Sequence, residues 1–147
     1  MKFTEFQPGQ AFDLGPYRVE QREMIEFARA WDPQWFHTDP DSALEGPFEG
    51  LIASGWHSCA IAMRLVVDSL LADSESFASP GIRHLQWLHP VRPEDQLSLR
   101  VTVLELRRSS KRPQLGILEW RWQLRNQLDI EVLELEATSM FNLDPES

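Results

Sequence analysis

The order of apolar and polar residues predicts an amphipathic helix near the N-terminus. Apolar side chains recur at helical intervals in Met24, Phe27, Ala28 and Trp31, which places them on one face of a helix. Pro33 disfavours helical geometry at the residue before it. The helix is therefore expected to end at Asp32, which stands at a junction between helix and loop.

A second and more apolar helix is predicted to begin at Gly55. Apolar residues fill most positions from 56 to 71, and a helix that is apolar on most faces should be buried. Between the two helices, Asp39 followed by Pro40 is typical of an N-cap with proline in the first turn. This pair predicts a short helical turn through Leu44.

The second half of the chain changes to the alternating pattern of β-strands. Apolar and polar residues alternate over 97–103, 118–124 and 130–137. The last alternation slips by one residue between Val132 and Leu133, which predicts a β-bulge. Residues 82–88 predict a fourth strand, and the segment before the first helix can supply a fifth.

One buried helix followed by long antiparallel strands predicts the α+β class. In the expected architecture a curved antiparallel sheet wraps around the central helix, which is the hotdog fold. No linker interrupts the pattern, so residues 1–147 are expected to form a single domain. Such a sheet leaves an edge strand and an apolar flank to cover, which predicts a homodimer or a dimer-based oligomer.

Composition narrows the class of protein further. The 147 residues are 42% apolar and 25% charged, as in an ordinary globular domain. A formal net charge of −9 argues against a nucleic-acid partner, because it repels a phosphate backbone. The single cysteine, Cys59, cannot form an internal disulfide or hold zinc alone, and neither a metal nor a cofactor is expected.

The location of the protein is expected from two missing signals. The longest uncharged stretch, residues 50–63, is shorter than the roughly 18 apolar residues that span a bilayer. The first residues lack a continuous apolar signal core. A soluble, cytoplasmic protein without a membrane partner is the expectation.

Asp32 and His37 are the residues most typical of catalysis. They stand five residues apart on a segment that is expected to be irregular and that is flanked by aromatic residues. A carboxylate and a neutral imidazole that converge on one water can divide acid and base work between them. The spacing alone also fits purely structural roles, with Asp32 ending a helix and His37 hydrogen-bonded in the interior.

Three stretches together resemble the MaoC-like dehydratases, a family that includes the (R)-specific enoyl-CoA hydratases. The family motif Asp-x-Asn-Pro-x-His-x-Asp is matched at Asp32, His37 and Asp39, with Gln34 and Trp35 in place of Asn and Pro. Residues 50–55 resemble the family's Ile-Ala-x-Gly entry to the hotdog helix. Residues 89–97 resemble its Pro-Val-x-x-Gly-Asp-x-Leu stretch.

The resemblance implies an activity and a role for each matched residue. Asp32 and His37 would hold the water that adds across a trans-2-enoyl thioester, and the backbone N–H of Gly55 would stabilise the enolate oxygen. The substrate would be a coenzyme A thioester. Ala60 stands where the hydratases of this family often carry serine. A thioesterase on the same scaffold and a non-catalytic acyl-CoA-binding module remain open alternatives.

Further residues are expected to bind this substrate. Ser54 and the tryptophans Trp31, Trp35 and Trp56 lie near the candidate site in the sequence and can line an acyl pocket, which the resemblance places at a dimer interface. Four basic residues crowd between two predicted strands: Arg107, Arg108, Lys111 and Arg112. They can meet the phosphates of coenzyme A, or they can form a solvated hairpin tip that discourages aggregation.

Overall fold

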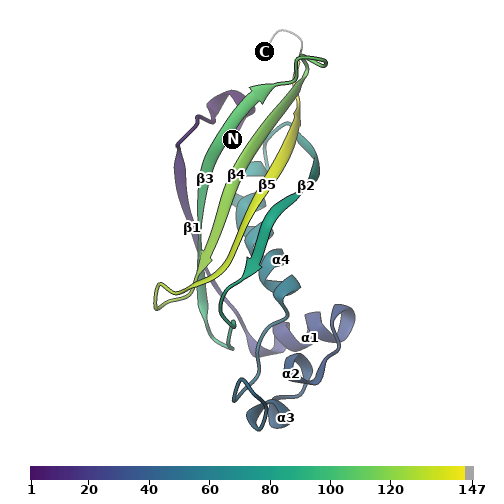
Figure 1. Ribbon diagram of the computed structural model, residues 1–147, viewed down its shortest axis with the longest axis vertical. Helices are drawn as coiled ribbons and strands as arrows, with labels where there is room; N and C mark the ends of the chain where they lie inside the picture. Colours follow the sequence, from purple (N-terminus) through teal and green to yellow (C-terminus); the bar gives the residue numbers. More distant parts are fainter. Residues whose placement is uncertain (145–147) are drawn as a thin grey trace.

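A five-stranded antiparallel sheet forms one layer of the molecule, and a long helix, α4, lies against it (Figure 1). The computed structural model describes residues 1–144. In their order across the sheet, the strands are β1 (Ala11–Arg18), β3 (Gln96–Arg108), β4 (Leu115–Arg125), β5 (Glu131–Asn142) and β2 (Ser76–Trp87). This is the predicted hotdog arrangement, with β1 and β2 at the two edges.

The helices divide between the sheet face and one end of the molecule. Helix α4 (Gly55–Val66) continues into a π-helical turn, Val67–Leu71. The short helices gather near the N-terminal end of α4 (Figure 1) and are α1 (Gln21–Trp31), α2 (Trp35–Thr38) and α3 (Pro40–Leu44). The hairpin between β3 and β4 lies at the opposite end of the sheet.

The core lies between the sheet and α4, and alternation along the strands builds it. Every second residue of β4 is buried, and in β3 the alternation holds as far as Val103. These side chains meet the buried face of α4, which carries Ile61, Ala62 and Val66. Full burial stabilises the fold by about 1.5–3 kcal/mol for each large apolar side chain. The expectation that α4 is buried on most faces is wrong on one side, since Trp56 and Met63 are exposed.

Two strand predictions have different outcomes. The bulge in β5 is confirmed, because Val132 and Leu133 are both buried and the pairing with β4 shifts register beside them. The fourth strand begins at Ser76, six residues earlier than predicted. The first half of this strand shows no regular alternation of apolar and polar residues, because Pro80 and the register shifts on either side of Gly81–Arg83 interrupt it. Such irregularities are typical of edge strands.

The segment from Asp32 to Pro40 is more regular than expected. It contains the helical turn α2, and the predicted cap of α3 is confirmed because Asp39 accepts a hydrogen bond from the backbone N–H of Ser42. In residues 1–144 no helix is long and apolar enough to cross a membrane. The last three residues of the predicted domain, 145–147, lie outside the described part of the chain.

Candidate active site

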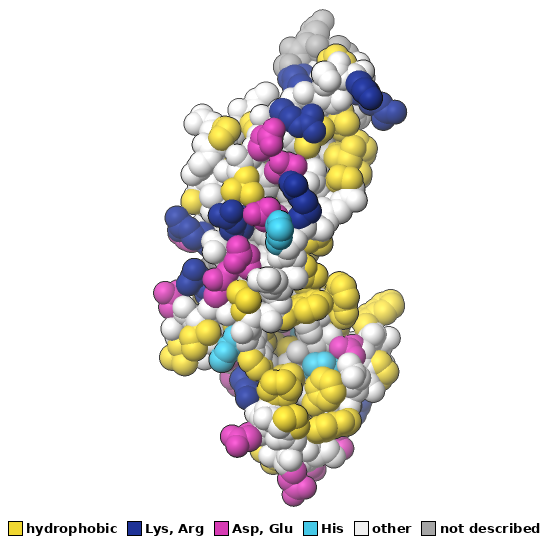
Figure 2. Space-filling model, viewed as in Figure 1, with side chains coloured by type: hydrophobic (Ala, Val, Ile, Leu, Met, Phe, Trp, Pro, Cys, Tyr) yellow, Lys and Arg dark blue, Asp and Glu magenta, His cyan; other side chains and the backbone are white. Residues whose placement is uncertain are grey.

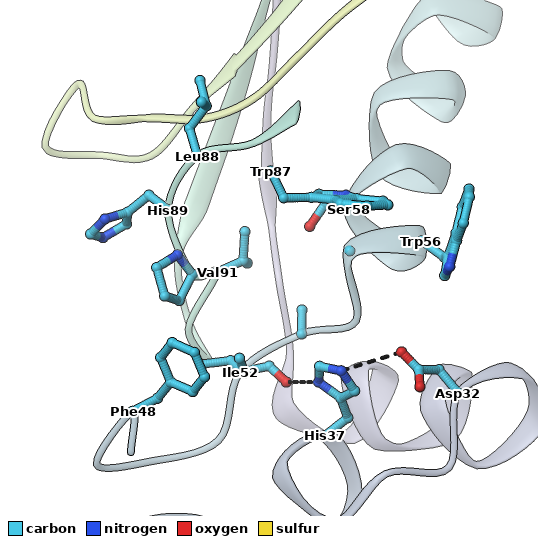
Figure 3. Close-up of a pocket in the computed structure, with 13 residues that line it drawn as sticks. Asp32, His37, Phe48, Ile52, Trp56, Ser58, Trp87, Leu88, His89 and Val91 are labelled. Carbon is cyan, nitrogen blue, oxygen red and sulfur yellow. Dashed lines mark hydrogen bonds and ion pairs between the residues drawn. The ribbon is translucent and has the colours of Figure 1, made fainter. Parts of the chain in front are cut away.

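A bend between α1 and α2 brings Asp32 and His37 together. Asp32 is the C-cap of α1, where Pro33 stops the helix, and His37 lies on α2. The Nε2 atom of His37 is 3.2 Å from Oδ2 of Asp32 (Figure 3), and their side chains are only 7% and 16% exposed. The two groups that the sequence singled out therefore form a largely buried pair.

Hydrogen bonds fix the carboxylate of Asp32 from two sides. Its Oδ1 accepts from Nε2 of Gln34 at 2.7 Å, and its Oδ2 accepts from the hydroxyl of Ser54 at 2.8 Å. Burial by itself raises the pKa of Asp32, but these two hydrogen bonds and the nearby His37 together outweigh it and hold the pKa below its usual value. Asp32 is therefore an oriented, ionised carboxylate at neutral pH.

The backbone determines the orientation and tautomer of His37. Its Nδ1 lies 2.8 Å from the carbonyl oxygen of Ile52, and because a carbonyl only accepts, Nδ1 carries the proton in this contact. In the neutral imidazole Nε2 is then the unprotonated nitrogen, and it faces Asp32. The Asp32–His37 pair can therefore accept one proton, which would lie between Oδ2 of Asp32 and Nε2 of His37.

A cavity of about 460 Å³ opens beside the pair, and most of its wall is apolar. Thirteen residues line it, among them Asp32, His37, Phe48, Ile52, Gly55, Trp56, Ser58, Trp87 and Leu88. In Figure 3 the pair lies on one side of this space and Trp87 and Ser58 lie on the other. A long apolar group and a polar reacting centre can be accommodated together in such a cavity.

Gly55 is the first residue of α4 and lies on the cavity wall. Within residues 1–144 its backbone N–H has no hydrogen-bond acceptor. A side chain at this position would collide with Trp87, since a Cβ would lie 2.5 Å from the indole ring. The N–H is therefore a donor at the positive end of a helix, in a place that requires glycine.

Comparison with known proteins agrees with these features. The model of the MaoC like domain family matches residues 4–118. The chain is 35% identical over 138 residues to YdeM, an uncharacterized protein of Bacillus subtilis, covering 94% of this chain and 96% of YdeM. It belongs to the MaoC-like domain family.

Solved structures show the same relationship in three dimensions. A MaoC-like dehydratase from Rhodospirillum rubrum superposes with a TM-score of 0.87 and 36% identity, covering 97% of both chains. The (R)-hydratase PhaJ1 of Pseudomonas aeruginosa has a TM-score of 0.79 and 23% identity, covering 97% of this chain and 86% of that one. At that identity the likeness to PhaJ1 shows the fold alone.

The cavity of this MaoC-like domain includes residues that sequence reasoning did not assign to it. Ser58 is buried and lines the cavity, whereas Ala60 lines a second cavity elsewhere on α4. Trp87 comes from β2, far along the chain, and no sequence signal connects it with Gly55. Ser58 has such a signal, because residues three apart share a helix face and it follows Gly55 by three.

Of the residues predicted to bind substrate, some line the cavity and others lie away from it. Trp56 lines the cavity as expected. Ser54 is fully buried and bonds Asp32 instead of lining the cavity. Trp35 packs on Gly46, and Trp31 is 77% exposed; neither lines the cavity. The basic hairpin residues lie at the far end of the sheet, away from this cavity (Figure 1).

A second polar cluster of the MaoC-like domain ties α1 to α4 and β1. The carboxylate of Glu23 on α1 accepts from the hydroxyl of Tyr17 at 2.6 Å and lies 3.2 Å from Nε2 of His57. Phe27 stacks on His57, with ring centroids 4.7 Å apart. These contacts hold α1, whose end carries Asp32, against the first turn of α4. No group of His, Cys, Asp and Glu in residues 1–144 is arranged to hold a metal ion.

Proposed function

We propose that this protein hydrates a trans-2-enoyl thioester of coenzyme A, or dehydrates the corresponding 3-hydroxyacyl thioester. The observation that carries the proposal is the oriented Asp32–His37 pair on the wall of an apolar cavity that also contains the N–H of Gly55. The R. rubrum protein, which is 36% identical to this chain, is named a MaoC-like dehydratase, which supports the same reaction class.

The proposed reaction steps follow from the positions of the proton acceptors Asp32 and His37 and of the N–H donor of Gly55. A water held by Asp32 and His37 loses a proton to Asp32 as its oxygen attacks the β-carbon of the enoyl group. The C=C electrons move toward the thioester oxygen, where the N–H of Gly55 stabilises the enolate. The proton crosses the 3.2 Å contact from Oδ2 to Nε2, and His37 delivers it to the α-carbon. The net change is the addition of one water.

The apolar wall of the cavity fits an acyl chain beside this reacting centre. The cavity is lined in part by four large apolar side chains, those of Phe48, Ile52, Trp56 and Leu88. None of the four carries a charged group that could bind a polar chain. The acyl chain would enter past Trp56 and Leu88, which are both about half exposed. Leu88 directly follows the edge strand β2, and Trp56 lies on α4 beside it, so a second copy would complete the cavity wall in the proposed homodimer.

The test is the substitution Asp32→Asn, assayed with crotonyl-CoA by the loss of enoyl absorbance. Removing a positioned base is expected to lower kcat by about 10²-fold or more. Asp41→Asn is the matched control, because Asp41 is an exposed carboxylate of the same segment that does not line the cavity. Unchanged turnover in Asp32→Asn would remove this residue from the mechanism.

Product analysis separates the proposed reaction from its two alternatives. Hydration consumes the enoyl absorbance without releasing a thiol, and this is the expected result. Release of free coenzyme A would indicate a thioesterase, in which Asp32 directs water at the carbonyl carbon. Tight binding of acyl-CoA without turnover of any enoyl or acyl thioester would indicate a binding module.

A further inference from the structure

Helix α1 is fixed to the start of α4 at both of its ends. At its C-terminal end, Oδ2 of Asp32 accepts from the hydroxyl of Ser54 at 2.8 Å. In its first turn, the carboxylate of Glu23 lies 3.2 Å from Nε2 of His57. The helical rise places Glu23 and Asp32 about 13 Å apart along the axis of α1. The orientation of α1, and with it the position of Asp32, therefore depends on both contacts.

Glu23 is the acceptor in the second of these contacts. The hydroxyl of Tyr17 donates to its carboxylate, at 2.6 and 2.7 Å from the two oxygens. Because an ionised carboxylate only accepts, Nε2 of His57 carries the proton in its contact with Glu23. His37, in contrast, carries its proton on Nδ1, which faces a carbonyl oxygen. The two buried histidines therefore hold opposite tautomers.

The second ring nitrogen of His57, Nδ1, is buried without a partner. The side chain is 3% exposed, and no hydrogen-bond partner for Nδ1 lies within residues 1–144. Burying a polar atom without a hydrogen bond costs free energy. A phenylalanine would occupy similar space and stack on Phe27, as the imidazole does, without this cost. The feature that favours histidine over phenylalanine at this position is therefore the contact of Nε2 with Glu23.

Neither residue of this contact lines the cavity in which the reaction is proposed to occur. That cavity lies between the end of β2 and the short helices, where Figure 2 shows hydrophobic side chains gathered. Glu23 and His57 line a different cavity, of about 590 Å³, beside α1 and α4. The neighbours of His57 in the chain, Trp56 and Ser58, do line the first cavity. An effect of Glu23 or His57 on the reaction must therefore pass through the two helices.

Resting on the proposed function, we propose that Glu23 and His57 are positioning residues, whose contact fixes the orientation of α1 across the start of α4 and so holds Asp32 in its reactive place. Without this contact α1 is attached to α4 by polar groups only at its Asp32 end, and it can tilt. The tilt lengthens the hydrogen bond from Ser54 to Asp32 and moves the carboxylate relative to the N–H of Gly55. A misplacement of about 1 Å can lower turnover by about 100-fold.

The first test is the substitution His57→Phe, which keeps the ring and its stacking on Phe27 and removes both ring nitrogens. For crotonyl-CoA we expect kcat to fall by about 10- to 100-fold, with little change in KM because the cavity wall is intact. The midpoint of urea denaturation should not be lower than in the wild type, since the unpartnered Nδ1 is removed as well. A lower midpoint with unchanged kcat would show that His57 serves the packing alone.

The second test addresses the contact from its other side. Glu23→Leu should lower kcat as much as His57→Phe does, and the double variant should be no slower than either single variant, because all three lack the same contact. His57→Gln returns an N–H donor near the position of Nε2 and should recover part of the lost kcat. Glu26→Leu is the matched control, because Glu26 lies on the same helix and is paired with the exposed Arg22. Its kcat should be that of the wild type.

The pH profile distinguishes a moved Asp32 from a merely weakened fold. The hydrogen bond from Ser54 is one of the interactions that hold the pKa of Asp32 low, so a longer bond raises that pKa. We expect the acid limb of kcat/KM to lie at higher pH in His57→Phe and in Glu23→Leu than in the wild type. Loss of the negative charge of Glu23 would by itself move this limb to lower pH, so a rise indicates repositioning. A purely structural role leaves the limb unchanged.

The outcomes for this inference and for the proposed function can be told apart. If kcat and the acid limb of His57→Phe are those of the wild type, or if Glu26→Leu has the same defects, the inference is overturned and the hydratase assignment stands. If His57→Phe does not fold, Glu23→Leu serves for the same two measurements. If the wild type turns over no enoyl thioester, the proposed function fails, and NMR titration of the Asp32 carboxyl group then tests the inference. A higher pKa in His57→Phe than in the wild type supports it, and equal values overturn it.

Discussion

The hydroxyl of Ser54 donates a 2.8 Å hydrogen bond to Oδ2 of Asp32, the same oxygen that faces Nε2 of His37. Ser54 precedes the first residue of α4, and Asp32 follows the last residue of α1. This one contact therefore connects the end of one helix to the start of another and holds the carboxylate beside the imidazole, on the wall of the cavity that Gly55 also lines.

Removing the hydroxyl of Ser54 should change how both the stability of the fold and kcat/KM depend on pH. The folded-state pKa of Asp32 is lowered, so its ionised form stabilises the fold above the unfolded-state pKa, and that stability is lost as the pH falls through the folded-state pKa. Ser54→Ala moves the pKa of Asp32 upward and reduces this contribution. We expect a loss of about 1–3 kcal/mol at neutral pH and an acid limb of kcat/KM displaced to higher pH.

A matched serine provides the control for this experiment. Ser42 donates its hydroxyl to Asp39 at 2.7 Å, on an exposed helix cap away from the cavity. Ser42→Ala should leave the acid limb of kcat/KM where it is in the wild type. If Ser54→Ala and Ser42→Ala have the same pH profile, Ser54 does not determine the ionisation of Asp32.

The periodicity of the sequence was sufficient to predict the helices and strands whose side chains pack in the core. The alternation in β4, in β5 and in β3 as far as Val103 corresponds to faces that are buried in the structure, as does the interval from Met24 to Ala28, whereas Trp31, at the end of that helix, is 77% exposed. The start of β2 could not be found in this way, because an exposed edge strand has no buried face to impose alternation. Its proline and its irregular register remove the remaining signal.

The candidate site was predictable only where its residues are close in sequence. Asp32 and His37 belong to one bend, and Gly55 begins a helix, so local patterns indicate all three. Trp87 reaches Gly55 through the pairing of β2 with β5, which depends on the whole sheet. Ser54 was placed in the correct region, but nothing in the sequence shows that its hydroxyl is used by Asp32.

Gly55 should tolerate a side chain only when Trp87 is made smaller. In Gly55→Ala the added Cβ would lie 2.5 Å from the indole, and overpacking of this kind costs about 1–3 kcal/mol. Chemical denaturation should show this loss in the wild-type background and little or none in a Trp87→Leu background. Equal losses in the two backgrounds would mean that the indole does not exclude a side chain at position 55.

Tyr17 offers a direct optical test of the second polar cluster, because it is the only tyrosine of the chain. Burial and the hydrogen bond to Glu23 raise the pKa of Tyr17 to about 12. The raised pKa contributes stability below the unfolded value of about 10, and this is lost as the pH rises through the folded value. Tyrosinate absorbance should therefore appear near pH 12, and at lower pH in Glu23→Gln. Appearance near pH 10 in both proteins would show that Glu23 does not hold the phenol.

Ser58 and Ala60 lie on different faces of α4, and substitutions at the two positions test which face meets the substrate. Ser58 lines the cavity with Asp32 and His37, while Ala60 lines the cavity that contains Tyr17 and Glu23. Ser58→Ala should lower kcat/KM for crotonyl-CoA by about tenfold, the effect of one neutral hydrogen bond, with an unchanged melting temperature. Ala60→Ser should leave kcat/KM unchanged, because a hydroxyl there faces away from the reacting groups. A gain of activity in Ala60→Ser, or no loss in Ser58→Ala, would contradict this assignment of the two faces.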